Sequence, residues 1–457
     1  MAPTRILPYA ALLLVAQIAL DAAPTIVAER EGGMGLGSAL IIGSVVQVSA
    51  LAFGATVAVY LVERRSGALA LIAGAVLLYA GLMAVGTAPM GALTWLTVAM
   101  ALAGLGYGVI LTAAFATAAA VTPRSRGVAI GLLLAVMLLA RSVAGTVWAL
   151  GPIVLIIVGG AVVVLSVLSV RSGSAPCVEQ GSRGTLAAGR AISTGALIGL
   201  GTLLAVAGAD PSRLTAALLA GFVGVGSFEM LDTARTAMLG LGLPILGIGS
   251  AVLVGRPGVR GIRWSAPALA LGTMAAVGTS SAMSLGSLYA SSPEGGAVAH
   301  AAAAVGGGTL GIAVAAWSSA RGVDRRVLGL VGGGVIVVVS VIGLVVLAGA
   351  LTAVGGILSV VLVAGSAIGL GLVAFVLRLD LAEVPSQQRG LGAAAGVVAG
   401  AVGSVLGSTL GVGQGVRLVS GAASGVTLGA VTMVIAAVAS LILIGVAARR
   451  DGPLSRR

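Results

Sequence analysis

The stretch GALTWLTVAMALAGLGYGVILTAAFATAAAV, residues 91–121, contains no charged side chain and decides the class of fold. An α-helix rises about 1.5 Å per residue, so about 20 apolar residues cross the roughly 30 Å hydrocarbon core of a membrane. The sequence predicts an all-α polytopic membrane protein with about 14 spanning helices, because thirteen further apolar runs reach this length. They lie at 6–28, 38–62, 67–87, 127–150, 152–170, 191–209, 236–255, 264–290, 298–319, 327–349, 351–377, 390–413 and 424–447.

The composition excludes several other classes of protein. Of the 457 residues, 59% are hydrophobic and 8% are charged, whereas soluble domains carry about 25% charged residues. A disordered chain, a disulfide-stabilised secreted domain and an ordinary cytosolic enzyme are therefore excluded. The chain has one cysteine, Cys177, and one histidine, His300. One cysteine and one histidine provide too few side chains for a typical metal site or for acid–base catalysis. We therefore expect no cofactor and no enzymatic activity.

The arginines orient the predicted spans. All 25 basic residues are arginines, and the net charge is +12. With a cytoplasmic N-terminus and 14 spans, 20 arginines lie in inside segments and four in outside segments, while Arg141 lies within a span. Cytoplasmic loops of membrane proteins carry such an excess of basic residues. We therefore expect a protein of the plasma (inner) membrane with both termini in the cytoplasm, and no binding of nucleic acid.

One apolar run is too short to be assigned as a span by its length. Residues 214–228 would form a helix of about 22 Å. Counting this run as a fifteenth span would place the arginines of the 318–326 loop outside, against the positive-inside rule. We predict that it does not span if both neighbouring runs do. Length favours 191–209 together with 236–255, and the choice among the three runs stays open.

Two pairs of loops resemble each other across the chain. VTPRSRGVAIGLLLA at 121–135 matches VPSQQRGLGAAAGVVAG at 384–400: each has a proline, a polar turn and then Arg-Gly opening a helix of small residues. LVERRSG at 61–67 matches SSARGVDRR at 318–326, each after the second helix of a six-helix set. Such parallel repeats are typical of one large transporter fold.

The repeats predict three parts of the chain. Residues 1–170 form an N-terminal six-helix bundle, and residues 171–263 form a cytoplasmic linker plus inserted helices. Residues 264–457 form a C-terminal six-helix bundle with a short cytoplasmic tail.

With these features the sequence resembles the major facilitator superfamily, and within it the 14-helix drug/proton antiporter branch. The first run ends LDAAPTIVA at 20–28, similar to the L-D-x-T-I-V pattern of that branch, which also inserts two helices between its halves. The resemblance implies helix packing through two groups of glycines, one in the GLGYG segment. These are Gly104, Gly106 and Gly108, and Gly403, Gly407 and Gly411. Met100 stands where proton antiporters usually have an arginine.

The resemblance also implies a role for charged loops. In the family, the loops after the second and eighth core helices form charge networks with neighbouring helix ends that hold the outward-facing state. The alternative is that the arginines serve only to orient the chain. The residues concerned are Glu63, Arg64 and Arg65 in the first loop, and Asp324, Arg325, Arg326, Arg378 and Asp380 in and near the second.

Two charges fall inside predicted spans. Asp21 and Arg141 lie about 22 Å and 21 Å from the cytoplasmic ends of their helices. A charge at the bilayer centre is costly, so such residues are candidates for function. In the family fold these two helices are neighbours, and we expect the side chains to pair as a proton-linked or substrate-linked switch. A static ion pair that joins the helices is the alternative.

A third group of charges lies in the insert. Glu229, Asp232 and Arg235 share one helical face because they are three residues apart. They form either a charged hinge or gate, or a solvated helix end.

We therefore expect a secondary transporter that exports a hydrophobic or amphipathic small molecule by alternating access, coupled to protons. Its partners would be this substrate, protons and membrane lipid, and we expect a monomer. Two alternatives stay open: an exporter of lipid or a lipid-like molecule, and a membrane protein that retains the fold without transporting.

Overall fold

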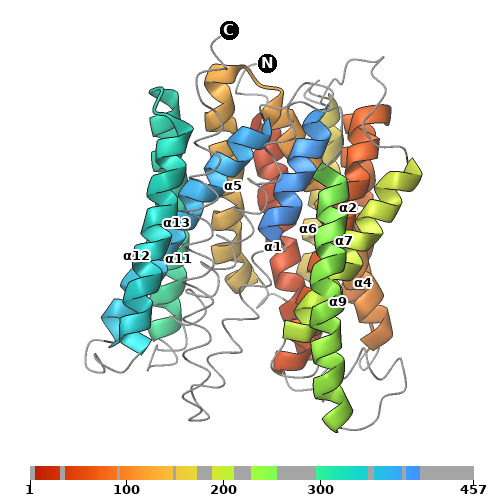
Figure 1. Ribbon diagram of the computed structural model, residues 1–457. Coiled ribbons are helices and arrows are strands. Elements are labelled where there is room, and N and C mark those ends of the chain that lie inside the picture. Colours follow the sequence, from red (N-terminus) through yellow and green to blue (C-terminus); the bar gives the residue numbers. More distant parts are fainter. Residues whose placement is uncertain are drawn as a thin grey trace. The chain divides into compact units, whose positions relative to one another are not determined.

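The computed structural model describes residues 6–30, 36–89, 93–147, 151–171, 188–209, 228–254, 295–347, 355–382 and 388–401. Within these ranges the regular structure is helical (Figure 1). Eleven long α-helices are followed by a helical segment at 389–401, and a short π-helical turn, η2 (Leu61–Arg65), follows α2. The helices are α1 (Leu7–Arg30), α2 (Leu36–Tyr60), α3 (Gly67–Thr87), α4 (Leu93–Ala119), α5 (Pro123–Val147), α6 (Ile153–Arg171), α7 (Ala188–Ala209), α9 (Phe228–Val254), α11 (Gly295–Ala320), α12 (Arg325–Leu347) and α13 (Gly355–Ala382).

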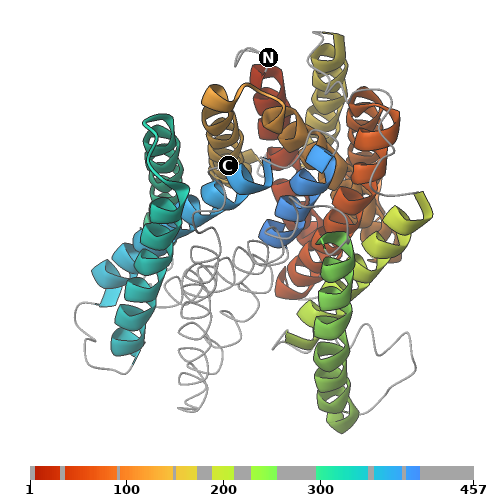
Figure 2. The same cartoon turned by 45° about the horizontal axis from the view of Figure 1, so that its top comes forward.

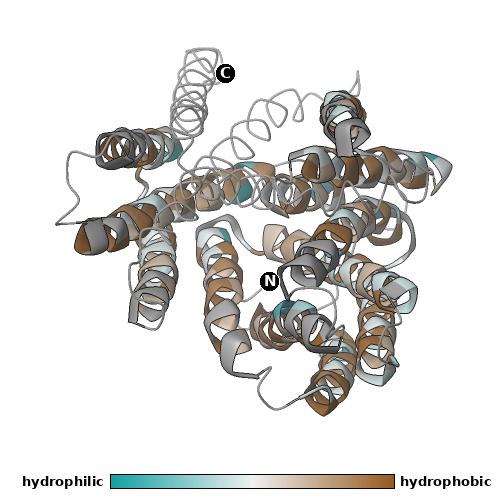
Figure 3. Ribbon diagram, turned by 90° about the horizontal axis from the view of Figure 1, so that it is seen from below, coloured by the Kyte–Doolittle hydropathy of each residue, from teal (hydrophilic) through white to brown (hydrophobic). Residues whose placement is uncertain are grey.

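Eight of the described helices are long and apolar enough to cross a membrane. They are α1, α2, α3, α4, α6, α7, α11 and α13. Figure 3 shows many strongly hydrophobic residues along the described helices. Three others carry shorter apolar stretches, at Ser125–Ala140 in α5, Ala237–Ser250 in α9 and Val327–Ile336 in α12. The chain is therefore a multi-pass integral membrane protein. The count of 14 spans stays a prediction, because the runs at 264–290 and 424–447 lie outside the described residues.

The chain forms two compact units. One contains Met1–Ile262 and Leu381–Val402, and the other contains Arg263–Asp380 and Gly403–Arg457. In the first unit α1 packs against α2, α4, α5 and α6, while α3 packs against α4 and α6. Helices from the whole N-terminal half of the chain therefore surround α1. The division at 170 and 263 stays a prediction.

Glycines bring α4 close to two neighbours. A Cβ at Gly104 or Gly108 would overlap the carbonyl oxygen of Gln47 or of Leu51, both on α2. A Cβ at Gly106 would overlap the backbone of α3 at Leu78. Small residues allow such close approach of membrane helices, so α4 lies wedged between α2 and α3. The second glycine group, at 403, 407 and 411, lies outside the described residues.

The inserted helices α7 and α9 lie side by side (Figures 1 and 2). A Cβ at Gly201 of α7 would lie 2.5 Å from the backbone nitrogen of Leu246 in α9. α7 also packs against α2, where a Cβ at Gly199 would lie 3.2 Å from the carbonyl oxygen of Ser49. The two runs favoured by length are therefore helices that form a pair attached to the first unit. Residues 214–227 of the short run lie outside the described residues.

In the second unit, α13 contacts both α11 and α12. Gly307 and Gly311 of α11 face the carbonyl oxygens of Ala364 and Ile368 of α13. On the α12 side, a Cβ at Gly369 would lie 2.7 Å from the side chain of Ile336. The described part of this unit is thus a three-helix layer around α13.

Candidate functional site

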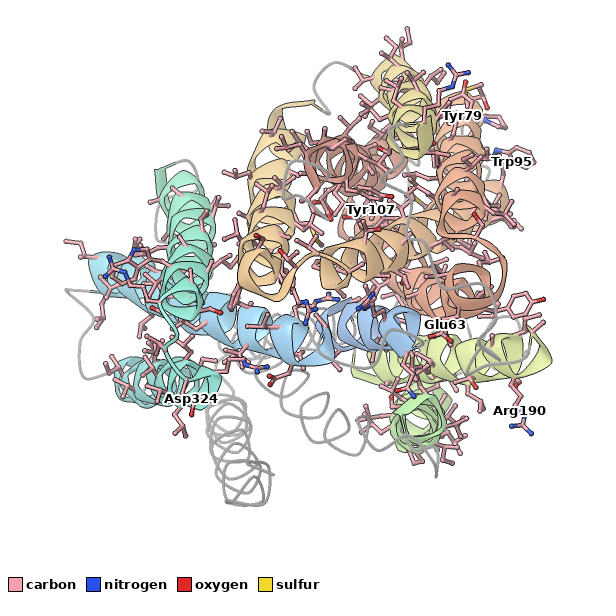
Figure 4. The ribbon with its side chains drawn as sticks, turned by 90° about the horizontal axis from the view of Figure 1, so that it is seen from above. Glu63, Tyr79, Trp95, Tyr107, Arg190 and Asp324 are labelled. Atoms are coloured by element: carbon pink, nitrogen blue, oxygen red, sulfur yellow. The ribbon has the colours of Figure 1, made fainter. Side chains whose placement is uncertain are left out.

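A chain of hydrogen-bonded polar side chains crosses from α1 to α4. Gln17 and Asp21 lie one turn apart on α1, and Gln17 Nε2 donates to Asp21 Oδ2 over 2.8 Å. The hydroxyl of Tyr107 on α4 donates to Gln17 Oε1. Gln17 and Tyr107 are buried and Asp21 is partly exposed. Figure 4 shows Tyr107 among the packed helices of the first unit. The side-chain amide of Gln17 therefore connects the carboxylate of α1 to the hydroxyl of α4.

A second contact lies at Leu20, the residue directly before Asp21 on α1. Pro24 is inside the helix, and a proline has no N–H to donate to the carbonyl four residues earlier, that of Leu20. Gln47 Nε2 from α2 donates to the Leu20 oxygen over 2.9 Å. Gln47 is buried, and its own carbonyl faces Gly104. The hydrogen bond that Pro24 removes from α1 is thus supplied by α2.

A further polar contact joins α1 to α4 near the other end of α1. The buried side chain of Tyr9 shares a hydrogen bond with that of Thr117. Thr117 Oγ1 in turn donates to the carbonyl of Ala113 over 2.8 Å. α1 is therefore held to α4 by polar side chains on either side of the apolar residues between Tyr9 and Gln17.

Of the two charges in predicted spans, the structure describes one side chain. α5, which carries Arg141, packs against α1. The Arg141 side chain lies outside the described residues, so its pairing with Asp21 stays a prediction. Sequence reasoning identified Asp21 but missed Gln17, Gln47 and Tyr107. The available signal was the four-residue spacing of Gln17 and Asp21 in an otherwise apolar run, together with the one tyrosine in GLGYG.

The first charged loop contacts a helix that is distant in the sequence. Glu63 lies in η2 and is buried. Its Oε1 accepts the backbone N–H of Leu391 over 3.0 Å, across 328 residues of sequence. A Cβ at Gly390 would lie 3.0 Å from Glu63 Cγ. Glu63 thus sits at the N-terminus of the 389–401 helix, where a carboxylate interacts favourably with the helix dipole and the unpaired N–H groups.

The second charged loop holds an ion pair between α12 and α13. Arg325 Nη1 lies 2.8 Å from Asp380 Oδ1, and both side chains are partly exposed. Asp324 precedes α12, and its backbone carbonyl accepts the N–H groups of Val327 and Leu328. Arg378, one turn before the end of α13, is largely buried. Two of the predicted loop charges, Arg325 and Asp380, are therefore brought together, and Asp324 directly precedes Arg325 in the sequence.

Several predicted residues have side chains outside the described residues. α9 begins at Phe228, so Glu229, Asp232 and Arg235 all belong to its first turns. Their roles, and the choice between a charged gate and a solvated helix end, stay predictions. The other residues with undescribed side chains are Arg64, Arg65 and Arg326. Among the side chains that the structure describes, there is no group of three or more His, Cys, Asp or Glu residues that could hold a metal ion.

The fold is similar to that of solved transporters. A bacterial homologue of the iron transporter ferroportin, in an outward-facing state, matches with a TM-score of 0.65 and 12% identity over 98% of this chain and 100% of that chain. The same homologue with soaked iron gives a TM-score of 0.62 at 12% identity, over 98% and 99% of the chains. FucP, a major facilitator superfamily transporter in the outward conformation, gives 0.55 at 13% identity, over 97% and 98%.

No protein-family model and no curated protein sequence matches the chain. At identities of 12–13% the structural likeness establishes the fold. The chain therefore has the all-helical fold of major facilitator superfamily transporters.

Proposed function

We propose that this protein is a secondary active transporter that exports a hydrophobic or amphipathic small molecule by alternating access, with protons moving the opposite way. The observation that carries the proposal is the partly exposed carboxylate of Asp21, which lies in a spanning helix and is hydrogen-bonded to Gln17. Ionisable residues inside spans are costly and commonly mark proton or substrate pathways. The fold, shared with known transporters, supports the same function.

In this proposal Asp21 alternates between an ionised and a protonated state. When ionised, the carboxylate accepts the hydrogen bond from Gln17, whose amide is oriented by Tyr107. Protonation removes the charge and therefore lowers the cost of placing this part of α1 in apolar surroundings. We assign Arg141 as the cationic partner of the ionised state, since its helix packs against α1.

The proposed substrate class rests on the composition of the buried interior. The buried residues are mostly alanine, leucine and valine. Several buried hydroxyls are used within their own helices: Thr56, Thr112 and Thr202 each donate to the carbonyl four residues earlier. Recognition of a sugar needs many convergent polar partners, whereas an apolar molecule needs few. We therefore favour a hydrophobic or amphipathic substrate.

The charged loops are proposed as gates. The contact between Glu63 and the N–H of Leu391 holds the η2 turn to the 389–401 helix within one unit. The Arg325–Asp380 pair holds α12 to α13 within the other. We propose that both contacts stabilise the outward-facing state, together with Arg64, Arg65, Asp324, Arg326 and Arg378. We propose that these contacts rearrange when the transporter changes orientation.

Transport by the full chain in liposomes tests the proposal. Ethidium and Nile red serve as a charged and a neutral hydrophobic probe, and a pH gradient drives the transport. We expect the gradient to drive at least one probe, and Asp21→Asn to abolish this coupling. Asp451→Asn, which removes a carboxylate beyond the last predicted span, is the matched control and should transport normally. Undiminished gradient-driven transport by Asp21→Asn would show that Asp21 does not couple transport to protons.

A further inference from the structure

A stripe of exposed side chains runs along α11 towards its end. Leu310 is 55% exposed, Val314 43% and Trp317 58%. Their spacings of four and three residues place them on one helical face. Arg321, four residues after Trp317, continues the stripe just beyond the last helical residue, Ala320. In a membrane such an apolar face contacts lipid, so the stripe passes from aliphatic side chains to an indole and then to a guanidinium.

The end of α11 fixes the position of Arg321. Gly322 has φ of +80°, and its N–H donates to the carbonyl of Ser319 over 3.1 Å. The N–H of Val323 donates to the carbonyl of Ser318 over 3.0 Å. This pair of bonds is the Schellman motif, which requires the left-handed backbone that glycine adopts readily. The backbone of Arg321 is therefore part of a closed helix cap rather than of an open loop.

The side chain of Arg321 folds back onto the aromatic ring. Its guanidinium carbon lies 3.8 Å from the centroid of the Trp317 ring, which is the geometry of a cation–π contact. A ring face accepts the charge but uses none of the five N–H donors, which point outward in the guanidinium plane. The contact thus orients a charged group and leaves its donors for another partner.

The neighbouring Arg325, unlike Arg321, has a carboxylate partner in the described part of the chain. Arg325 is paired with Asp380 at 2.8 Å. In the described ranges, the contact found for the Arg321 side chain is the Trp317 ring, and no described carboxylate lies within ion-pair distance of its guanidinium. Asp324 is an exposed carboxylate three residues away, at the start of α12. The exposed guanidinium at the end of the stripe is therefore a positive group that none of the described carboxylates of its unit neutralises.

Tryptophan is enriched where hydrocarbon gives way to headgroups, and arginine near a helix end reaches the same level. A planar guanidinium matches the oxygens of a phosphate through two parallel hydrogen bonds. We propose that Arg321, held by Trp317, binds the phosphate of an anionic membrane phospholipid at the end of α11. The indole then covers the adjoining part of the lipid, and the unit gains a headgroup-selective lipid site. This site is independent of the proposed transport function.

Fluorescence quenching of Trp317 tests the proposal on the full chain in nanodiscs. Trp95, Trp148 and Trp264 are replaced by phenylalanine, and Trp317 is quenched by lipids brominated on the acyl chains. Phosphatidylglycerol and phosphatidylcholine are compared at equal bromine content. We expect about a fivefold preference for the anionic lipid at Trp317, the effect of one arginine near the membrane surface. In Arg321→Gln the ratio should fall to about one, whereas Arg321→Lys should retain part of the preference.

Trp95 offers a matched control. It is 53% exposed, similar to Trp317, but its indole N–H donates to the carbonyl of Ala84 at 3.0 Å. A protein that retains only Trp95 should show no headgroup preference that depends on Arg321. An unchanged ratio in Arg321→Gln, with an unchanged melting temperature, would overturn the proposal. So would loss of the preference when inorganic phosphate is added, because the ligand would then be a free anion rather than a lipid.

Discussion

The side-chain amide of Gln47 donates to the carbonyl oxygen of Leu20 at 2.9 Å, in place of the N–H that Pro24 lacks. A buried carbonyl without a donor costs about 1–3 kcal/mol. A side chain of α2 therefore replaces a backbone hydrogen bond that α1 lacks at Leu20, the residue next to Asp21. The proline and the glutamine should accordingly act as a unit, although they lie on different helices.

Replacing Gln47 by leucine should lower the free energy of unfolding by about 1–3 kcal/mol, because the Leu20 carbonyl loses its donor. In a Pro24→Ala background the same change should cost less, because the substituted residue regains a backbone N–H that can donate to Leu20 within α1. Thermal unfolding of the four proteins in detergent gives the coupling energy, which we expect to be about 1 kcal/mol. Additive effects of the two substitutions would show that Gln47 does not compensate for Pro24.

Gln17→Leu and Tyr107→Phe should impair coupled transport without additivity, because both substitutions interrupt the same hydrogen-bond chain to Asp21. Tyr107→Phe alone should lower the free energy of unfolding by about 0.5–1.5 kcal/mol. Tyr79→Phe is the control, since Tyr79 packs on α6 at Gly159 and should transport normally. If the double variant still couples transport fully to the pH gradient, the hydrogen bonds from Gln17 and Tyr107 do not position Asp21.

An alanine at Gly108 should destabilise the first unit, because its Cβ would overlap the carbonyl of Leu51 on the adjacent helix. Overpacking of this kind costs about 1–3 kcal/mol. Gly160→Ala in α6 is the matched control: a Cβ there meets nothing within 4 Å, and alanine favours the helix over glycine. Equal melting temperatures of the two variants would contradict the close α2–α4 contact.

Substituting Glu63 by alanine should expose the N–H of Leu391 to exchange. A charge-assisted hydrogen bond contributes about 1.5–3 kcal/mol, which predicts at least a tenfold faster exchange of this amide. Glu63→Gln retains a neutral acceptor and should give an intermediate rate. Hydrogen–deuterium exchange measured on a peptide that covers Leu391 provides the test. Unchanged protection in Glu63→Ala would mean that another group holds the start of this helix.

The helices were predictable because a span must be apolar over its whole length. The run at 67–87 coincides with α3 (Gly67–Thr87), which starts after Ser66, whose hydroxyl accepts the N–H groups of Ala68 and Leu69. Boundaries next to charged residues were less predictable. α5 begins at Pro123 rather than 127, since proline suits the first turn of a helix. α9 begins at Phe228 rather than 236 because its helix continues through the charged residues.

The partners of the polar groups could not be predicted in the same way. Periodicity within one helix places Gln17 and Asp21 on a common face, but it does not indicate that Tyr107 approaches that face. The contact between Glu63 and Leu391 joins residues 328 positions apart, and only the folded chain brings them together. The resemblance to a transporter family identified Glu63 as a candidate, whereas its partner followed from the structure.

If the protein works by alternating access, the surface around Asp21 opens in turn to the two sides of the membrane. Accessibility of a cysteine at this position tests the claim without a known substrate. In Asp21→Cys/Cys177→Ser, the uncharged thiol replaces the protonated carboxyl, the form that changes orientation without substrate in a proton antiporter. A membrane-impermeant maleimide is applied to the inside or the outside of oriented proteoliposomes. We expect labelling from both sides. Labelling from one side alone, or from neither, would show that Asp21 is not alternately accessible.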